Sequence, residues 1–378
     1  MLAIINATLV MREYLIPDAT LLCENGKIVD FGKKLAVPEG AEVLDAKGNY
    51  VGPGLIDIHT HAACGVWFYE DPKTAAEKIL EHGVTTVLPV VYFNRNKAQF
   101  IGDIKTIQAS VAKGEFPNFG GFYMEGPYLN PKFGADREGN PWKGPICADD
   151  YMDIIRQGGK DARVWALAPE REHIEDFVIA CKEENPNVVF TVAHSEATPE
   201  DIEKLIPYGL KIGTHHTNAT GTLQKYPECR TPCVDETVHY NRDIYAEIIS
   251  DSMGIHVDPY IQRLTRKIKG DDRVILVADA CVFDGPIPDG YDGVTDLCFD
   301  FAGEIAGSKL TLDVACRNFM VHTGASITNV FQFASYNPAQ AVGLKDRGEI
   351  RKGYVADLVI CDHMVNINKV ILKGEIAK

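Results

Sequence analysis

Histidine and carboxylate side chains recur in this sequence directly after short apolar runs. The first run, Leu55–Ile58, leads into His59 and His61, which point the same way off an extended backbone. The residues that follow such runs are His59, His61, Glu125, His194, His215, His256 and Asp279. Neutral imidazoles and a carboxylate suit a divalent ion such as zinc and leave a position for water, whose pKa then falls toward about 7. The pattern predicts a metal centre that activates water.

Asp279 ends the last of these runs and could play a different part. A carboxylate that binds the metal weakly or not at all can take a proton from the water and return it to a leaving amine. No serine or cysteine nucleophile stands in a recognisable elbow. We therefore expect metal-assisted hydrolysis of a C–N bond rather than covalent catalysis.

Each of these residues also has a structural explanation when taken singly. His194 could be a hydrogen-bonded core histidine, Glu125 a salt-bridged carboxylate, and Asp279 a helix cap. His215 and His216 are adjacent and point to opposite faces, so only one of them can enter the site. Five of the 11 histidines at predicted strand ends, with two carboxylates, are harder to explain as a structural accident.

The segment from residue 52 to 343 must position these side chains. Its strand candidates, mostly followed by stretches of helical periodicity, are Leu55–Ile58, Thr85–Val91, Gly120–Met124, Val164–Leu167, Val188–Ala193, Leu210–Gly213, Ala246–Ile249 and Val274–Ala278. Eight such units predict an α/β fold, a TIM-like (β/α)8 barrel, whose chemistry lies at the C-terminal ends of its strands. An open doubly wound sheet is the alternative, disfavoured because no glycine-rich phosphate fingerprint follows the first strand.

Both ends of the chain have a different pattern, with short alternating segments bounded by turn residues such as Asn25-Gly26 and Lys373-Gly374. We expect residues 1–51 and 344–378 to come together as one small β-sandwich domain, built from antiparallel strands. The barrel domain, residues 52–343, would be inserted between them.

Composition excludes several classes of partner. The 378 residues carry a formal net charge of −15 without a long basic stretch, which argues against nucleic acid and an anionic membrane surface. An anionic substrate would have to be held by local groups. The ten cysteines form no Cys-x-x-Cys pair, and no signal peptide or apolar membrane span is recognisable, so we expect a cytoplasmic protein.

The motifs around these residues resemble the amidohydrolase superfamily and, within it, the N-acetylglucosamine-6-phosphate deacetylases. They are Gly54–His61, Gly83–Thr86, Met124–Pro127, Leu129–Pro131, Ala166–Glu170, Ala193–His194, Thr214–His215, Asn218–Ala219, Gly254–Val257, Leu276–Ala280, Asn337–Ala341 and Gly353–Val359. The resemblance covers nearly the whole chain. It implies a metal-dependent hydrolase that removes acetate from an N-acetyl amino sugar 6-phosphate, and it suggests a homodimer.

The resemblance also implies roles for single residues. Glu125, His194 and His215 would bind the principal ion, and His59 with His61 would hold a second where two are used. Zn²⁺ is the first choice, with Fe²⁺, Mn²⁺, Co²⁺ or Ni²⁺ as alternatives. The remaining roles are general acid/base for Asp279, contact with the sugar and its acetamide for His256, and backbone donors to the phosphate for Asn218 and Ala219.

The substrate side departs from the family pattern. The segment Thr220–Tyr240 is longer and different where relatives carry a phosphate-binding arginine, and Arg230 is the nearest candidate. The loop after the third strand has Asp136 where the deacetylases often show histidine. Two alternatives therefore stay open: an amidohydrolase acting on an epimeric (galactosamine-type) sugar, an unphosphorylated sugar or another amide, and a non-catalytic metal-binding relative.

Overall fold

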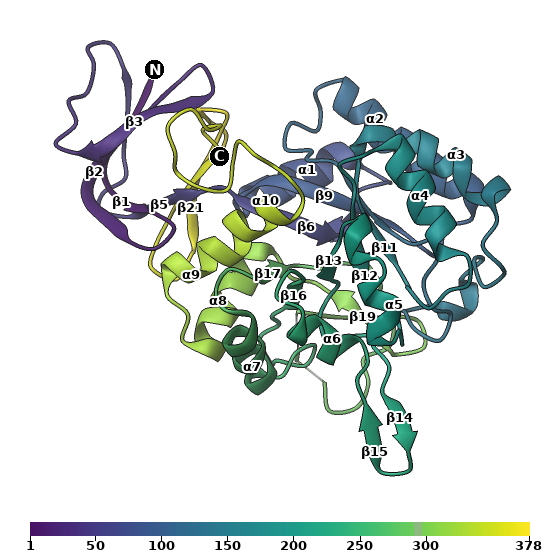
Figure 1. Cartoon of the computed structure of the whole chain (residues 1–378). Coiled ribbons are helices and arrows are strands. Elements are labelled where there is room, and N and C mark those ends of the chain that lie inside the picture. Colours follow the sequence, from purple (N-terminus) through teal and green to yellow (C-terminus); the bar gives the residue numbers. More distant parts are fainter. Residues whose placement is uncertain (292, 295) are drawn as a thin grey trace.

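Two eight-stranded sheets, one in the middle of the chain and one made from its two ends, organise the protein (Figure 1). The computed structural model describes residues 1–291, 293–294 and 296–378. The middle sheet is parallel throughout and carries the helices of the chain around it. The terminal sheet lies beside it, with both chain ends in the same region.

The parallel sheet is the predicted (β/α)8 barrel. Its strands, in spatial and sequence order, are β6 (Leu55–Thr60), β9 (Val84–Tyr92), β10 (Phe122–Glu125), β11 (Ala162–Leu167), β12 (Val189–Val192), β13 (Leu210–Gly213), β16 (Tyr245–Ile249) and β17 (Val274–Val277). The first and last strands meet beyond their C-terminal ends, where the backbone N–H of Asp279 donates to the carbonyl of His59 at 2.9 Å. The N–H of His61 donates to the carbonyl of Ala280 at 3.0 Å. The ends of β6 and β17 are thereby locked together.

The barrel strands are almost entirely buried, because their outer faces are covered by helices and their inner faces fill the barrel. The covering helices are α1 (Pro72–Glu81), α2 (Lys97–Ala112), α3 (Ala148–Gly158), α4 (Ile174–Glu184), α5 (Pro199–Glu203), α6 (Val234–Tyr240), α7 (Pro259–Lys269) and α8 (Leu312–Thr323). Local sequence explains where they begin. Helix α1 starts at Pro72, with Asp71 accepting from the N–H of Thr74, and α2 starts with a capping box of Asn96 and Gln99.

After α8 the chain turns back toward the terminal sheet through α9 (Ile327–Phe331), a π-helical turn (Gln332–Tyr336) and α10 (Asn337–Ala341). The side chain of Ser335 donates to the carbonyl of Gly54 at 3.0 Å. Asn337 donates to the carbonyl of Val274 at 2.7 Å. These bonds tie this segment to β6 and β17 at the N-terminal side of the barrel.

The terminal sheet joins both chain ends, as expected. Its strands are β1 (Leu2–Val10), β2 (Leu15–Glu24), β3 (Lys27–Lys33), β4 (Glu42–Asp45), β5 (Tyr50–Pro53), β20 (Leu358–Cys361), β21 (Ile367–Leu372) and β22 (Glu375–Ile376). The hairpins β1–β2, β2–β3 and β20–β21 are antiparallel, and β5 pairs antiparallel with β20. The pairings of β4 and β5 with β1 are parallel, so the sheet is mixed. Sequence reasoning missed this because alternation sets the face of a strand, not its direction.

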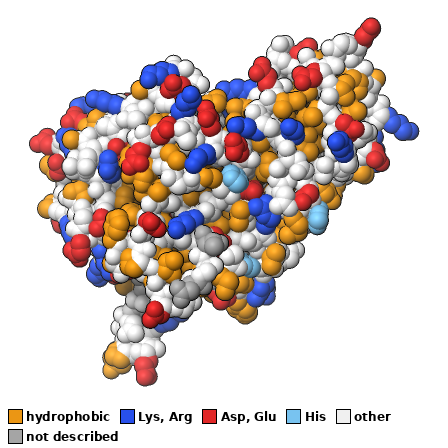
Figure 2. Space-filling view, turned by 180° about the vertical axis from the view of Figure 1, so that it is seen from behind, with side chains coloured by type: hydrophobic (Ala, Val, Ile, Leu, Met, Phe, Trp, Pro, Cys, Tyr) orange, Lys and Arg blue, Asp and Glu red, His pale blue; other side chains and the backbone are white. Residues whose placement is uncertain are grey.

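Among the described residues, three two-stranded hairpins extend beyond the barrel: β7 (Ala62–Ala63) with β8 (Val66–Trp67), β14 (Leu223–Tyr226) with β15 (Cys229–Thr231), and β18 (Leu297–Phe299) with β19 (Ile305–Ser308). The β14–β15 hairpin lies within the segment that departs from the family pattern, and it projects away from the body of the molecule (Figure 1). On the face shown in Figure 2, basic and acidic side chains are interspersed. In the described part of the chain, no helix combines the length and apolar character needed to cross a bilayer.

Candidate active site

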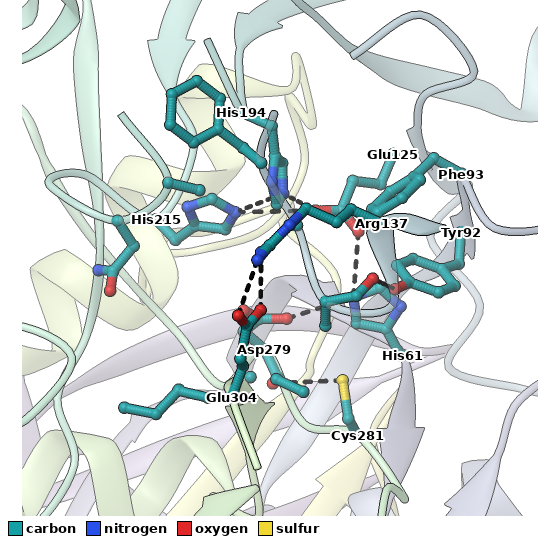
Figure 3. Close-up of a pocket in the computed structure, with 18 of the residues that line it drawn as sticks. His61, Tyr92, Phe93, Glu125, Arg137, His194, His215, Asp279, Cys281 and Glu304 are labelled. Carbon is teal, nitrogen blue, oxygen red and sulfur yellow. Dashed lines mark hydrogen bonds and ion pairs between the residues drawn. The ribbon is translucent and has the colours of Figure 1, made fainter. Parts of the chain in front are cut away.

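A pocket of about 280 Å³ opens at the C-terminal ends of the barrel strands (Figure 3). Its walls include eight of the ten side chains singled out in the sequence: His61, Glu125, His194, His215, Asn218, Ala219, His256 and Asp279. His59 lies beneath them, fully buried. The fold thus brings together residues that are up to 220 positions apart, as the barrel prediction requires.

Three donor atoms at or just beyond the C-terminal ends of β10, β12 and β13 form a compact triangle. Oε1 of Glu125 is 2.8 Å from Nε2 of His194 and 3.7 Å from Nε2 of His215. The two Nε2 atoms are 3.1 Å apart. Ligands of one tetrahedral zinc ion, each about 2.1 Å from it, lie about 3.4 Å apart, so the triangle has the dimensions of a metal-ligand set.

A second group shares Glu125 with the first. Nε2 of His61 lies 3.2 Å from Oε2 of Glu125, and Nε2 of His59 lies 3.9 Å from its Oε1. Among the described residues, neither Nε2 of His59 nor Oε2 of Glu125 has a hydrogen-bond partner, although both atoms are buried. Buried polar atoms are normally paired. The donor types and the unpaired atoms together fit a divalent cation.

The electrostatics of the cluster favour a positive charge. Burial by itself lowers the pKa of the His59 imidazole, but Asp279, Glu247 and Glu125 outweigh it and raise that pKa to about 10. Burial likewise raises the pKa of Glu125, yet the imidazoles of His194, His215 and His61 hold it well below its usual range. Carboxylates placed so closely draw in either protons or a metal cation.

Asp279 lies beyond the end of β17, opposite the triangle. Its Oδ1 is 3.2 Å from Nε2 of His61 and 3.7 Å from Nε2 of His59. Burial works against its ionised form, but His59 and His61 lower its pKa below the ordinary value. The carboxylate is therefore available as a proton acceptor that faces the metal-ligand cluster.

Three of these residues have a backbone conformation that side chains other than glycine rarely adopt. The φ angles of His194, His215 and Asp279 are 43°, 27° and 46°. Left-handed backbone in a non-glycine residue costs about 1–3 kcal/mol and is concentrated at functional sites, where the surrounding structure enforces it. Here it turns each side chain into the pocket just where a strand ends.

Two carboxylates that sequence reasoning missed orient the histidines from behind. Oε2 of Glu247 lies 3.1 Å from Nδ1 of His59 and accepts from the backbone N–H of His215 at 3.2 Å. Because a carboxylate only accepts, Nδ1 of His59 carries the proton and Nε2 is left to face the cluster. Asp251 holds the ring of His256, with 3.1 Å between Oδ2 and Nδ1, while Nε2 of His256 lies 3.1 Å from the carbonyl oxygen of Gly307. The available signal was a charged residue inside the apolar run of β16, Glu247.

His216, the neighbour of His215 just beyond β13, faces away from the pocket, as expected. Nε2 of His216 lies 3.0 Å from Nε2 of His239, outside the pocket. Arg230, the predicted phosphate ligand, is on β15 in the projecting hairpin, 72% exposed and paired with Glu236. It is not among the residues that line the pocket. Asn218 is, and its buried Nδ2 has no hydrogen-bond partner among the described residues, so this donor is free for a ligand.

A (β/α)8 barrel with buried imidazoles and carboxylates at its strand ends defines the class of the protein: a hydrolase that depends on a divalent metal. The sequence model of the Amidohydrolase family matches residues 50–377, which is most of the chain. The chain belongs to the amidohydrolase family.

Curated relatives and solved structures are similar over nearly the full length. The N-acetylglucosamine-6-phosphate deacetylase of Lysinibacillus sphaericus is 27% identical over 93% of this chain and 92% of its own. The N-acetylgalactosamine-6-phosphate deacetylase of Escherichia coli O157:H7 is 25% identical over 94% and 97%. The structure of N-acetylglucosamine-6-phosphate deacetylase from Thermotoga maritima has a TM-score of 0.83 at 25% identity, covering 100% and 99%.

Proposed function

We propose that this protein removes acetate from an N-acetyl amino sugar 6-phosphate by metal-dependent hydrolysis. The observation that carries the proposal is the Glu125, His194 and His215 triangle with the ionised carboxylate of Asp279 facing it in one pocket. The relatives named above add the class of substrate, because those proteins are sugar-phosphate deacetylases.

Each residue then has a definite task. A divalent cation held by Glu125, His194 and His215 would supply Lewis acidity and lower the pKa of water toward about 7. Asp279 takes the proton of the attacking water and delivers it to the nitrogen that leaves. Glu247 keeps His59 in one tautomer and position. The C–N bond of the acetamide breaks, and acetate and the free amino sugar are released.

The substrate would be held on the opposite side by His256, Asn218 and Ala219. Asp251 fixes the ring of His256 by accepting from its backbone N–H at 2.8 Å and from Nδ1. In this proposal His256 contacts the sugar and helps to polarise the acetamide carbonyl. Nδ2 of Asn218 and the backbone amide of Ala219 donate to the anionic group in this proposal. The backbone N–H of Asn218, which the resemblance suggested as a further donor, already donates to the carbonyl of His215 at 2.8 Å.

Zinc is the ion we propose first, because imidazole and carboxylate donors at these separations suit it; Fe²⁺, Mn²⁺, Co²⁺ and Ni²⁺ use the same donor types. Cys281, His61 and Asp279 form a third group of donors close enough for one ion. This group is not part of the proposal, because burial and Asp279 raise the pKa of the Cys281 thiol well above its usual value, and the thiolate is the form that binds metal. We propose one principal ion and a second held by His59 and His61.

We further propose that residues 1–51 with 344–378 and residues 52–343 are the two domains of the chain, and that the protein is a homodimer. The two hydrophobic cores, one in each sheet, support the division. Exposed apolar side chains on and near the projecting hairpin, such as Tyr226 and Tyr240, support an interface there. A cytoplasmic location stays a prediction from the sequence.

Acetate release tests the function directly. Purified protein with zinc would be offered N-acetylglucosamine, N-acetylgalactosamine and their 6-phosphates, with bound metal measured in parallel. We expect the highest kcat/KM for the 6-phosphate of N-acetylglucosamine. A preference for the galactosamine epimer would favour the second candidate, which the Escherichia coli O157:H7 relative supports. Bound metal without acetate from any of the four sugars would refute the deacetylase.

A further inference from the structure

The charged side chains around the pocket leave few choices for a group that could receive an anionic substrate. In the described part of the chain, Lys132 and Arg137 are the only lysine or arginine residues that line the pocket. Each already has a carboxylate partner: Glu196 for Lys132 at 2.5 Å, and Glu304 for Arg137. Glu304 also lines the pocket, whereas Glu196 does not. Only the Arg137–Glu304 pair therefore lies wholly within the pocket wall.

This pair has the geometry that a phosphate would use. Nη1 and Nη2 of Arg137 donate to the two oxygens of Glu304, each at 2.7 Å. Figure 3 shows the arginine reaching across the pocket in front of Asp279 toward Glu304. The planar guanidinium offers the same two parallel donors to a phosphate as to a carboxylate. A phosphate carries more charge than Glu304 and can take its place.

The backbone holds both residues in position independently of their own ion pair. Asp300, a buried residue of the β18–β19 turn, accepts from the N–H of Asp136 at 3.2 Å and from the N–H of Glu304 at 2.9 Å. One carboxylate thereby joins the Arg137 loop to the turn that carries Glu304. Opening the ion pair would leave the two segments connected, and Arg137 would remain over the pocket.

Replacing Glu304 by a ligand anion in this ion pair would destabilise the protein little. The side chains of Arg137 and Glu304 are 40% and 47% exposed. Pairs this accessible contribute little to stability, because water screens them. Breaking the pair in favour of a ligand therefore costs the fold little.

We propose that Arg137 is the specificity-determining cation of this pocket. Its guanidinium gives up its ion pair with Glu304 and binds the phosphate of the substrate instead. The proposal rests on the proposed function and deepens it. It differs from the sequence prediction that placed Arg230 in this role. The anion would be bound between Arg137 on one side and the free Nδ2 of Asn218 on the other.

The test compares KM for the 6-phosphate and for the free sugar in Arg137→Ala, Arg137→Lys and Glu304→Gln. We expect Arg137→Ala to raise KM for the 6-phosphate about 10- to 100-fold, as for a lost charge-assisted pair, and to change KM for the free sugar less than about twofold. Arg137→Lys should lie between, because it keeps the charge but not the fork. Glu304→Gln should lower KM for the 6-phosphate, because Arg137 is released.

The double variant Arg137→Ala/Glu304→Gln separates exchange from general charge effects. If Glu304 acts by occupying Arg137, its substitution has no further effect once Arg137 is absent. Lys143→Ala is the matched control: this cation follows in the same loop and pairs with Glu138, outside the residues that line the pocket. Turnover of the free sugar shows that each variant is folded.

Three outcomes would overturn the assignment. They are equal effects of Arg137→Ala on both sugars, no effect on either, and a loss for the 6-phosphate that appears in Arg230→Ala instead. If the unmodified protein released acetate from neither sugar, the proposed function itself would fail, which is a different result from any of these three.

Discussion

The floor and the rim of the pocket are built in opposite ways. The floor comprises His59, His61, Glu125, His194, His215 and Asp279, all buried and all at or just beyond the C-terminal end of a barrel strand. The rim comprises the loop of residues 131–140 and the β18–β19 hairpin, whose side chains Arg137 and Glu304 form an exposed pair. The barrel strands fix the positions of the floor residues, whereas the rim residues lie in loops whose length the barrel does not determine.

This difference separates chemistry from specificity. Moving one floor residue disturbs several others, because Glu125 contacts both histidine groups and Asp279 faces His61. Rim residues such as Arg137 make one exposed pair each and can change without disturbing the metal-ligand set. Substitutions in the floor should therefore cost metal or turnover, and substitutions in the rim should change KM alone.

The largest expected effect is that of Asp279→Asn. The amide keeps the shape of the side chain but cannot accept the proton, so kcat should fall about 10²- to 10⁴-fold. Metal content and KM should change little. Steady-state kinetics and metal analysis check this. A loss below tenfold with metal retained would contradict the role of Asp279 as general base.

Next come the ligands of the triangle. His194→Ala and His215→Ala should each lower bound metal and activity together, by more than about 100-fold in affinity, since even outer partners of a metal ligand contribute 10- to 100-fold. His216→Ala is the control next to His215 and should retain the metal, because His216 contacts His239 instead. Metal titration of the three variants decides it. Equal losses in the His215 and His216 variants would show that the wrong face of β13 has been assigned.

Glu247→Gln tests whether a residue that lies behind the metal ligands also affects metal affinity. The amide can no longer accept from Nδ1 of His59 and the N–H of His215 through one charged oxygen. We expect affinity for the ion near His59 to fall about 10- to 100-fold. Glu304→Gln, in the rim, is the matched comparison and should leave metal affinity unchanged. Equal metal affinity in the Glu247→Gln and Glu304→Gln variants would show that Glu247 does not contribute to metal binding.

The smallest effect is expected outside both regions, at His82, which follows helix α1. Its Nδ1 is 3.2 Å from Asp313 of α8, and this hydrogen bond, with Cys64 nearby, raises the pKa of His82 from 6.5 to about 10. A pKa that is raised in the folded state stabilises the fold fully at pH values below the pKa of the unfolded state. This contribution is lost as the pH rises through the folded-state pKa of about 10. Because the imidazole is 37% exposed, we expect at most about 1 kcal/mol.

Urea unfolding of the protein and of His82→Gln, at about pH 6 and about pH 10, measures this contribution. The free energies of unfolding should differ at the lower pH and converge at the higher one, with kcat unchanged throughout. A difference that grows with pH would reverse the sign of the linkage and contradict the raised pKa.

How much of the site could be predicted differs between floor and rim. Glu125, His194, His215 and Asp279 could be found because each follows an apolar run, and parallel strands of a barrel must end on the same face. The neighbours His215 and His216 could be separated because adjacent side chains alternate. Arg137 gave no such signal, because it lies in a loop, where side chains do not alternate regularly and the sequence does not indicate which way they point.

The sequence by itself determined the barrel, its eight strands and the set of residues that meet at its mouth. A parallel strand that is buried on both faces appears in the sequence as a continuous apolar run, which can be recognised without the structure. Only the tertiary structure decided that Glu247 and Asp251 hold the histidines from behind, and that β4 and β5 run parallel to β1. Only the structure placed Arg137 over the pocket and Arg230 away from it. Contacts between loops distant in sequence depend on how far each chain segment reaches, which local periodicity does not encode.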